Sequence, residues 1–423
     1  MRRNSRNGFL MPPKGATVHT IPEPAPKQQG RFQRLFTSWS NDRDVAMFVK
    51  DTLDVTDIHQ GQIGNCWFLA GAASIIGNPW GTRLLKGCVV DCEDGWVIVR
   101  LFDGDLNPVY IRTRKTRASF MGAKSGVTGV HKTGFWSAAL EKAASVFTKT
   151  SDRHKIDVMN PSMTNTESGN PSEAFRMLLG CEVTEQVMSD VNIGGVEAQG
   201  PLDLILSNWA DNEVTQAQSA LRTILGGGVS LDTWKTHRPK VRQAVTMAKL
   251  SGDPGKISPA GVPAGIVQGI ASYIRTHRLW DKAYMGSGIY SARAEDLYRT
   301  ISSKIAGDCP VGFTTRKDIG KAQGTGHSGG ETLSFGMAGE HCYAVLDTFA
   351  ENVMARRKFI KVCNPWGRYG RAYKDADDSN APSLDPKEQE SGVFWMELSD
   401  FANAGVSLSI GSAIDFDVAL RVA

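Results

Sequence analysis

The chain of 423 residues lacks the sequence features that define several classes of protein. Its seven cysteines are an odd number, with no C-x-x-C pair and no quartet spaced like a zinc site. This excludes a disulfide framework as the basis of the fold and indicates a reducing compartment. No apolar run reaches the length of a membrane span, so an integral helical membrane protein is excluded as well.

An excess of positive charge is found only at the start of the chain. The net charge is +4, but residues 1–50 contain nine Lys and Arg against three Asp and Glu, so the remainder is slightly negative. A general nucleic-acid-binding surface is therefore not expected. Residues 1–44 are also rich in proline, and we predict a basic tail that is disordered or docks on the rest. Its early arginines precede no signal-peptide core, which predicts a protein that is cytoplasmic or delivered without a conventional signal peptide.

Residues 57–70 join a polar, glycine-containing loop to the start of an apolar helix. Cys66 stands at the junction, and the run from there to Ile76 is almost wholly apolar or small, which predicts a buried helix. A thiol at a helix N-terminus ionises readily, because the first N–H groups favour negative charge. Gln60 could supply an amide that, with the Cys66 N–H, stabilises an oxyanion. Taken alone, Cys66 would be interpreted as a packed core residue.

Two strand-like segments near the end of the chain carry the polar groups that a thiol nucleophile needs. His341 opens the first segment, and Asn364 closes the second just before a Pro-Trp-Gly turn that contains Trp366. In thiol enzymes an imidazole takes the thiol proton and a third group orients the imidazole. We predict that Cys66, His341 and Asn364 are catalytic, with Gln60 and Cys66 forming the oxyanion hole. Trp366 would shield the pair from water.

Three other residues are weaker candidates for this chemistry. His327 lies in the glycine-rich stretch 320–330 and has no strand setting, so it is a poor alternative base. Cys342 and Cys363 neighbour His341 and Asn364 in sequence. Neither has a loop-to-helix setting, and we predict that both are packed core residues.

Together these motifs resemble the catalytic core of calpains, which are papain-like cysteine proteases. The resemblance covers roughly residues 45–185 and 290–415. Five motifs carry it in order: Gln60 with Cys66-Trp67, residues 135–143, His341-x-Tyr343-x-Val345, Asn364 to Gly367, and residues 394–401.

The resemblance implies an α+β fold with two lobes, one mostly helical and one built on antiparallel strands. The first lobe would span residues 45–181 and the second residues 182–423. Residues 187–290 have no counterpart in the family pattern, and their periodicity predicts a helical insertion. Its basic residues could bind a partner protein, although a solvated helical face is the favoured interpretation.

The sequence departs from the calpain pattern at the calcium sites. Asp57 matches one expected carboxylate, but Gly134 and Gly370 stand where the family has acidic ligands. Ser391 and Val393 likewise replace acids before the closing strand. Because a hard dication needs charged oxygen ligands, we predict a core that needs no calcium for activity and uses no cofactor. Asp57 would then cap its loop.

The predicted function is cleavage of protein substrates by a Cys-His-Asn cysteine endopeptidase. The same residues describe acyl transfer in general, so a transglutaminase-like or deamidating enzyme is the alternative. Asn rather than Asp as the orienting group favours the peptidase. A non-catalytic protein-binding module is the other alternative, and the presence of all four site residues argues against it.

Overall fold

The computed structural model describes most of the chain, and the statements below concern those residues. They are residues 12–25, 37–61, 63–92, 94–120, 123–124, 127–148, 155–188, 201–202, 204–206, 209, 214–250, 253–277, 290, 292–316, 337–350, 357–367, 384, 387–388 and 391–414.

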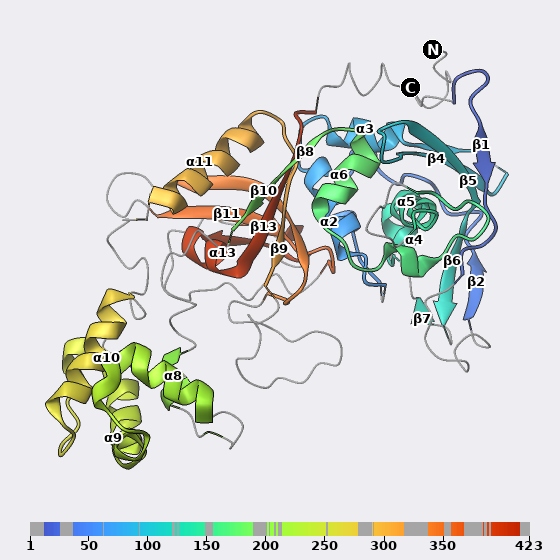
Figure 1. Cartoon of the computed structure of the whole chain (residues 1–423). Coiled ribbons are helices and arrows are strands. Elements are labelled where there is room, and N and C mark those ends of the chain that lie inside the picture. Colours follow the sequence, from blue (N-terminus) through green and yellow to red (C-terminus); the bar gives the residue numbers. More distant parts are fainter. Residues whose placement is uncertain are drawn as a thin grey trace. The chain divides into compact units, whose positions relative to one another are not determined.

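The chain divides into two compact units (Figure 1). The core comprises Met1–Ser189, Asp296–Phe349 and Lys358–Ala423, and the insert unit comprises Asp190–Glu295 and Ala350–Arg357. Within the core, we name residues 12–181 the Cys66 half and the described residues from 182 onward the His341 half. The predicted boundaries at residues 44 and 181 stay predictions.

The Cys66 half combines helices with two small sheets. Its helical segments are η2 (Val55–Asp57), α2 (Cys66–Ile76), α3 (Gly81–Gly87), α4 (Val130–Thr133), α5 (Trp136–Ala144), η3 (Met163–Thr166) and α6 (Pro171–Leu179). Its strands are β1 (Val18–Thr20), β2 (Thr37–Asn41), β3 (Val89–Asp91), β4 (Trp96–Phe102), β5 (Pro108–Arg114), β6 (Thr116–Phe120) and β7 (Ala123–Lys124). The strand orders are β1-β5-β4-β3 and β2-β6-β7.

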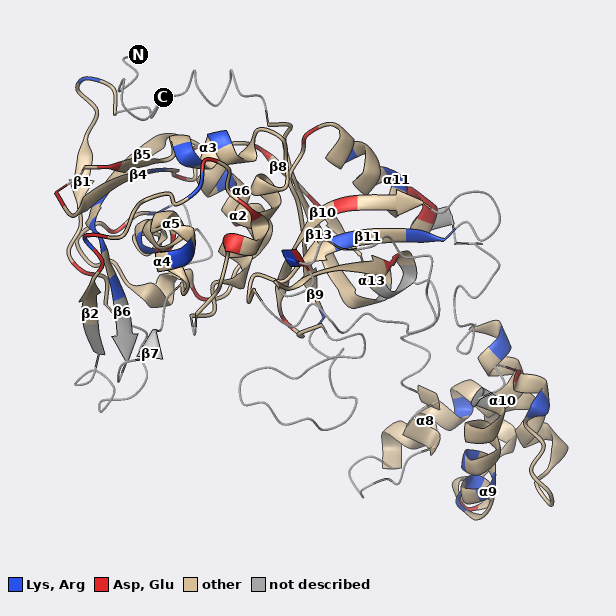
Figure 2. Ribbon diagram, turned by 180° about the vertical axis from the view of Figure 1, so that it is seen from behind, with Lys and Arg blue, Asp and Glu red and all other residues tan. Residues whose placement is uncertain are grey.

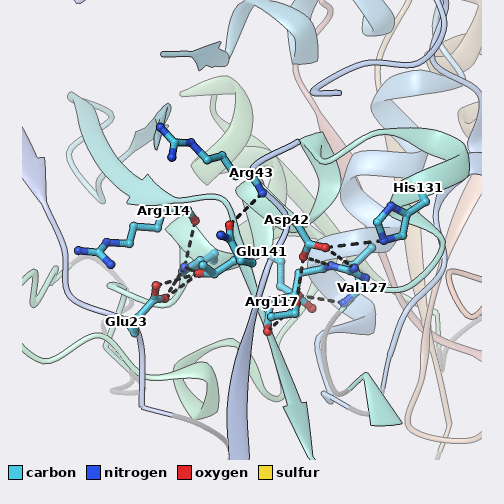
Figure 3. Close-up of polar contacts among 12 residues, drawn as sticks. Glu23, Asp42, Arg43, Arg114, Arg117, Val127, His131 and Glu141 are labelled. Atoms are coloured by element: carbon cyan, nitrogen blue, oxygen red, sulfur yellow. Dashed lines mark hydrogen bonds and ion pairs between the residues drawn. The ribbon is translucent and has the colours of Figure 1, made fainter. Parts of the chain in front are cut away.

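Strands β1 and β2 lie in the segment that the sequence led us to expect as a tail. β1 pairs in parallel with β5, and β2 pairs antiparallel with β6. Asp42, directly after β2, forms a buried ion pair with Arg117 of β6, at 2.6 and 2.8 Å (Figure 3). Glu23 forms an ion pair with the buried ammonium of Lys142 in α5. These described parts of the segment are therefore docked on the core.

Helix α2 lies at the centre of the core, and all 11 of its residues are buried. A helix that is apolar on every face needs neighbours all round, and α3, α5, α6 and β9 (Val311–Thr315) supply them. Its polar Ser74 accepts a hydrogen bond from Val311 N at 2.7 Å and donates one to Val311 O at 2.8 Å. The helix that begins with Cys66 is thus attached directly to a strand of the His341 half.

Gly71 of α2 allows α6 to approach closely, and its replacement by alanine should destabilise the core. A methyl group there would lie 2.4 Å from the Cβ of Ala174. Alanine favours a helix by up to about 1 kcal/mol over glycine, but overpacking a tight core costs about 1–3 kcal/mol. We expect Gly71→Ala to lower the free energy of unfolding, measured by chemical denaturation. The control Gly87→Ala, whose methyl meets no atom within 4 Å, should not lower it. Equal effects would contradict this account of the packing.

The His341 half is a six-stranded sheet in the order β12-β11-β10-β9-β13-β8. Its further elements are β8 (Val183–Val187), α11 (Ala292–Ala306), β10 (Cys342–Ala350), β11 (Lys358–Cys363), β12 (Val393–Glu397), α13 (Leu398–Ala404) and β13 (Gly405–Gly411). β9 pairs antiparallel with β10, and β11 pairs antiparallel with β12. β13 pairs antiparallel with both β8 and β9 and so joins them. Helices and antiparallel sheets in one core confirm the predicted α+β fold class.

The insert unit is helical, with α8 (Val214–Leu225), η5 (Gly226–Gly228), α9 (Leu231–Leu250), η6 (Pro254–Lys256) and α10 (Ala264–Thr276). Its core forms around Trp234, which is fully buried and donates a hydrogen bond from Nε1 to Ile205 O at 2.9 Å. α9 begins at Leu231, ahead of the regularly spaced buried residues Val241 and Val245. In its first turns Trp234 is buried and Leu231 is half-buried among polar residues, so no apolar repeat is visible there.

Lys and Arg positions recur along α9, where they are coloured blue in Figure 2. Lys235, Lys240 and Arg242 are exposed, and the Arg238 guanidinium stacks over the Trp209 ring at 5.0 Å. This is the distribution of a solvated helical face; partner binding through the insertion stays a prediction. Among the described residues, no helix combines the length and apolar character needed to cross a membrane.

Candidate active site

Cys66 is the first residue of α2, where the preceding loop enters the helix. Only 9% of the residue is exposed. The pKa of its thiol lies well below the ordinary value, because the Cys342 thiol donates a hydrogen bond to it and because His341 attracts and hydrogen-bonds the sulfur. Burial opposes ionisation but is outweighed. These contacts therefore favour ionisation of the thiol at this helix N-terminus.

His341 and Asn364 lie on neighbouring strands and contact each other directly. His341 directly precedes β10, Asn364 directly follows β11, and both side chains are buried. His341 Nε2 lies 2.9 Å from Asn364 Oδ1, which also accepts a hydrogen bond from Trp366 N at 3.1 Å. Since Oδ1 is an acceptor, Nε2 carries the proton. The other ring nitrogen, Nδ1, is then the one available to the thiol.

Aromatic rings enclose this pair. The Trp366 ring centroid lies 4.5 Å from that of His341, with the planes tilted at 45°. The ring of Tyr343 meets the imidazole edge-on at 5.0 Å and 89°. The imidazole is thus held between two rings, which restricts both its rotation and the access of water.

Thr315, at the end of β9, fixes the backbone of His341. Its Oγ1 accepts a hydrogen bond from His341 N at 3.0 Å and donates to Ala338 O at 2.7 Å. Thr315 N donates to His341 O at 2.8 Å. Sequence reasoning missed this residue, because a threonine that ends a buried strand carries no signal of its own.

Gln60 connects the loop before Cys66 to the turn after Asn364. Its backbone N donates to Pro365 O at 2.8 Å, and its side-chain Nε2 donates to Ile63 O at 2.6 Å. One hydrogen of the amide is committed to that carbonyl and the second stays free to donate. The predicted oxyanion role of Gln60 is neither tested nor contradicted by these contacts.

A buried carboxyl group holds the residue that precedes the nucleophile. Glu141 of α5 accepts hydrogen bonds from Asn65 Nδ2 at 2.5 Å and from Val127 N at 3.1 Å (Figure 3). Its complete burial raises its pKa to about 7. Because Asn65 is the N-cap of α2, Glu141 positions the start of the nucleophile helix. Sequence reasoning missed Glu141, because a single acidic residue within this helix carries no signal of its own.

Cys66, His341 and Asn364, the residues of the three motifs, therefore lie in one site. The model for calpain family cysteine proteases matches residues 25–192 and 275–412, which is most of the chain. This chain belongs to the calpain family. The resemblance stated from the motifs is confirmed, and the chain contains a calpain-family cysteine protease domain. A search of curated proteins finds no match.

At the first calpain calcium position, Asp57 is engaged by groups of the chain itself. It forms a capping box with Asp54, whose backbone N lies 3.0 Å from Asp57 Oδ2. The ammonium of Lys50 lies 2.7 Å from Asp57 Oδ1. At Gly134, with φ +101°, a Cβ would lie 2.5 Å from Met47 O, so an acidic side chain does not fit without movement. The described residues of this position do not fit a calcium ion.

Ser391 and Val393 stand at the other calcium position of the family pattern. Ser391 donates a hydrogen bond to Glu388 O at 3.0 Å, and Val393 is fully buried in β12. His327 and Gly370 lie outside the described residues. In the described part of the chain, no three His, Cys, Asp or Glu side chains are grouped as metal ligands.

Proposed function

We propose that this calpain-family domain is a cysteine endopeptidase whose catalytic residues are Cys66, His341 and Asn364. The observation that carries the proposal is the hydrogen-bonded His341–Asn364 pair beside a thiol with a strongly lowered pKa at a helix N-terminus. This is the arrangement of nucleophile, base and orienting group that acyl transfer requires.

In the first step, the Cys66 thiolate attacks the carbonyl carbon of a peptide bond. The carbon–sulfur bond forms, and the carbonyl electron pair moves to the oxygen. The Cys66 N–H and the free hydrogen of the Gln60 amide stabilise that oxyanion. The imidazolium of His341 then gives its proton to the leaving amine, so the carbon–nitrogen bond breaks without expelling an amide anion.

In the second step, water replaces the amine. His341, now neutral and held in one tautomer by Asn364, accepts a proton from water as the oxygen attacks the thioester. Collapse of the second tetrahedral intermediate returns the sulfur as a thiolate and releases the carboxylic acid. Trp366 and Tyr343 keep the imidazole oriented through both steps.

Calcium independence of this core is part of the proposal. A bound cation would have to displace the Lys50 ammonium from Asp57, and the backbone at Gly134 offers no carboxylate. The ion pair of Lys50 and Asp57 supplies, within the chain, the positive charge that a dication would otherwise bring to this loop.

Labelling and cleavage in the presence and absence of calcium test the proposal. We expect a peptidyl epoxide to label the wild-type chain at Cys66, identified by peptide mass spectrometry, and a denatured protein substrate to be cut at internal peptide bonds. Both rates should agree within about twofold in calcium and in excess chelator. The matched variant Cys92→Ser, which removes a thiol away from the site, should behave like wild type.

Three results would contradict parts of this proposal. Labelling only in calcium would overturn the calcium-free core. Incorporation of an added primary amine into the substrate without hydrolysis would identify the transglutaminase-like alternative. Neither labelling nor cleavage under any of these conditions would favour the non-catalytic binding module.

A further inference from the structure

Cys342 is a second thiol of the active site that the proposed mechanism does not use. It is the first residue of β10, directly after His341 and opposite Thr314 of β9. Its Sγ lies 3.6 Å from Gly169 O and 3.5 Å from Thr314 Oγ1, and only 2% of the residue is exposed.

Gly169, which contacts Cys342, also packs against the residue that follows Cys66. A Cβ on Gly169 would lie 2.7 Å from the ring of Trp67, the residue after Cys66, so this glycine packs flat on that ring. The indole Nε1 of Trp67 donates to Thr166 O at 2.7 Å, which holds the segment in place. Both cysteines belong to one buried apolar cluster, and both are free. Their side chains hydrogen-bond each other, and the backbone N–H of Cys342 also donates to Cys66.

The two sulfurs have opposite ionisation tendencies. The pKa of Cys342 is raised well above its ordinary value, by its hydrogen bond to Cys66, by burial and by repulsion from the Cys66 charge. Of the two sulfurs, Cys66 is therefore the one that ionises more readily. The nucleophilic thiolate is the form that peroxides oxidise, so oxidation begins at Cys66 and leaves Cys342 as an intact thiol.

We propose that Cys342 is the resolving thiol of Cys66, closing a reversible disulfide when a hydroperoxide oxidises the nucleophile. The Cys66 thiolate attacks one peroxide oxygen, the oxygen–oxygen bond breaks, and sulfenic acid and hydroxide form. The hydroxide takes a proton from the His341 imidazolium and leaves as water. Loss of the Cys66 charge removes the repulsion that disfavoured ionisation of Cys342, and the now neutral His341 accepts the Cys342 proton. The Cys342 sulfur then attacks the Cys66 sulfur, the sulfur–oxygen bond breaks, and water leaves.

Formation of the disulfide holds Cys66 in an oxidised form that a reductant can reverse. Without a resolving thiol, further peroxide converts sulfenic to sulfinic acid, which ordinary thiols do not reduce. With Cys342 in place, a dithiol reductant returns both residues to their starting state. The loss and recovery of activity rest on the proposed peptidase function, whereas the disulfide itself does not.

The test compares wild type with Cys342→Ser, which keeps a hydrogen-bond donor of similar size but cannot form the disulfide. Each protein is treated with hydrogen peroxide, freed of it, and then incubated with a phosphine reductant. In wild type we expect the intact mass to fall by two hydrogens, a peptide cross-link of Cys66 to Cys342, and recovery of more than about half of the probe labelling. In Cys342→Ser we expect a gain of two oxygens on Cys66 and recovery below about a tenth.

Two controls make each outcome decisive. Cys92→Ser should form the cross-link and recover like wild type, and Cys342→Ala supplies a second variant if the serine does not fold. A wild-type protein that gains oxygens without the cross-link, or a Cys342 variant that recovers equally well, would overturn the proposal. The mass measurement needs no activity, so a chain that forms the cross-link but neither labels nor cleaves would refute only the peptidase.

Discussion

Cys66→Ala is expected to lower kcat/KM for a protein substrate by at least about four orders of magnitude, because no other group can form the thioester. Cys342 cannot substitute for it, since its thiol is protonated and packed against Gly169 and Thr314. The measurement is initial cleavage rate against enzyme concentration, with epoxide labelling recorded on the same samples. Labelling should vanish together with turnover.

Stability of the variant separates this chemical effect from misfolding. Alanine at the first position of α2 keeps the helix, and it removes only a sulfur from a residue that is 9% exposed. Thermal unfolding should therefore stay cooperative. A folded Cys66→Ala protein that retains more than about a hundredth of wild-type turnover would show that another residue is the nucleophile.

His341→Ala is expected to abolish turnover by a comparable factor and to change the pH dependence of thiol alkylation. The lowered pKa of Cys66 means that wild type alkylates at pH values well below the ordinary thiol pKa, with the rate falling only as pH drops through the lowered value. Without the imidazole the hydrogen bond from Cys342 persists, but the attraction of His341 is lost, so the pKa rises. Alkylation by iodoacetamide at pH ~6 should fall about 10- to 100-fold, because the greater nucleophilicity of the more basic thiolate offsets part of the loss.

Asn364→Ala separates the effect of the His341 charge on the Cys66 pKa from the effect of the His341 orientation on turnover. It keeps the imidazole but removes the acceptor that holds Nε2 at 2.9 Å. We expect turnover to fall while alkylation at pH ~6 stays closer to wild type than in His341→Ala. An alkylation profile of His341→Ala that superimposes on wild type would contradict the thiolate–imidazolium pairing.

The α+β class and many of the elements could be predicted, because their local patterns are strong. The apolar run after Cys66 and the β-branched segments after His341 and before Asn364 each indicate one element by themselves. β1 and β2 could not be predicted in this way. They are short, they lie in a proline-rich segment, and β1 is a strand only because β5 offers it an edge.

The residues of the site also fall into two groups: those that a local motif identifies, and those whose contacts depend on the tertiary fold. A motif identifies the residue types that acyl transfer needs, and Cys66, His341 and Asn364 were found by it. Cys342 was correctly predicted to be packed, but its hydrogen bond to Cys66 joins residues far apart in the chain. The same holds for Glu141, whose hydrogen bond to Asn65 depends on how α5 docks beside α2. Such contacts follow from the tertiary fold and leave no pattern in a single sequence.

The pairing of β8 with β13 sets the order in which the molecule becomes complete during synthesis. Val183 lies opposite Gly411, so the sheet that carries His341 joins residues made early to residues made late. The helix that carries Cys66 packs mostly on elements that precede residue 180 and have then already left the ribosome. A nascent chain thus presents its thiol long before the imidazole is in place. The sheet beside which His341 and Asn364 lie can therefore be completed only after β13 has been synthesised.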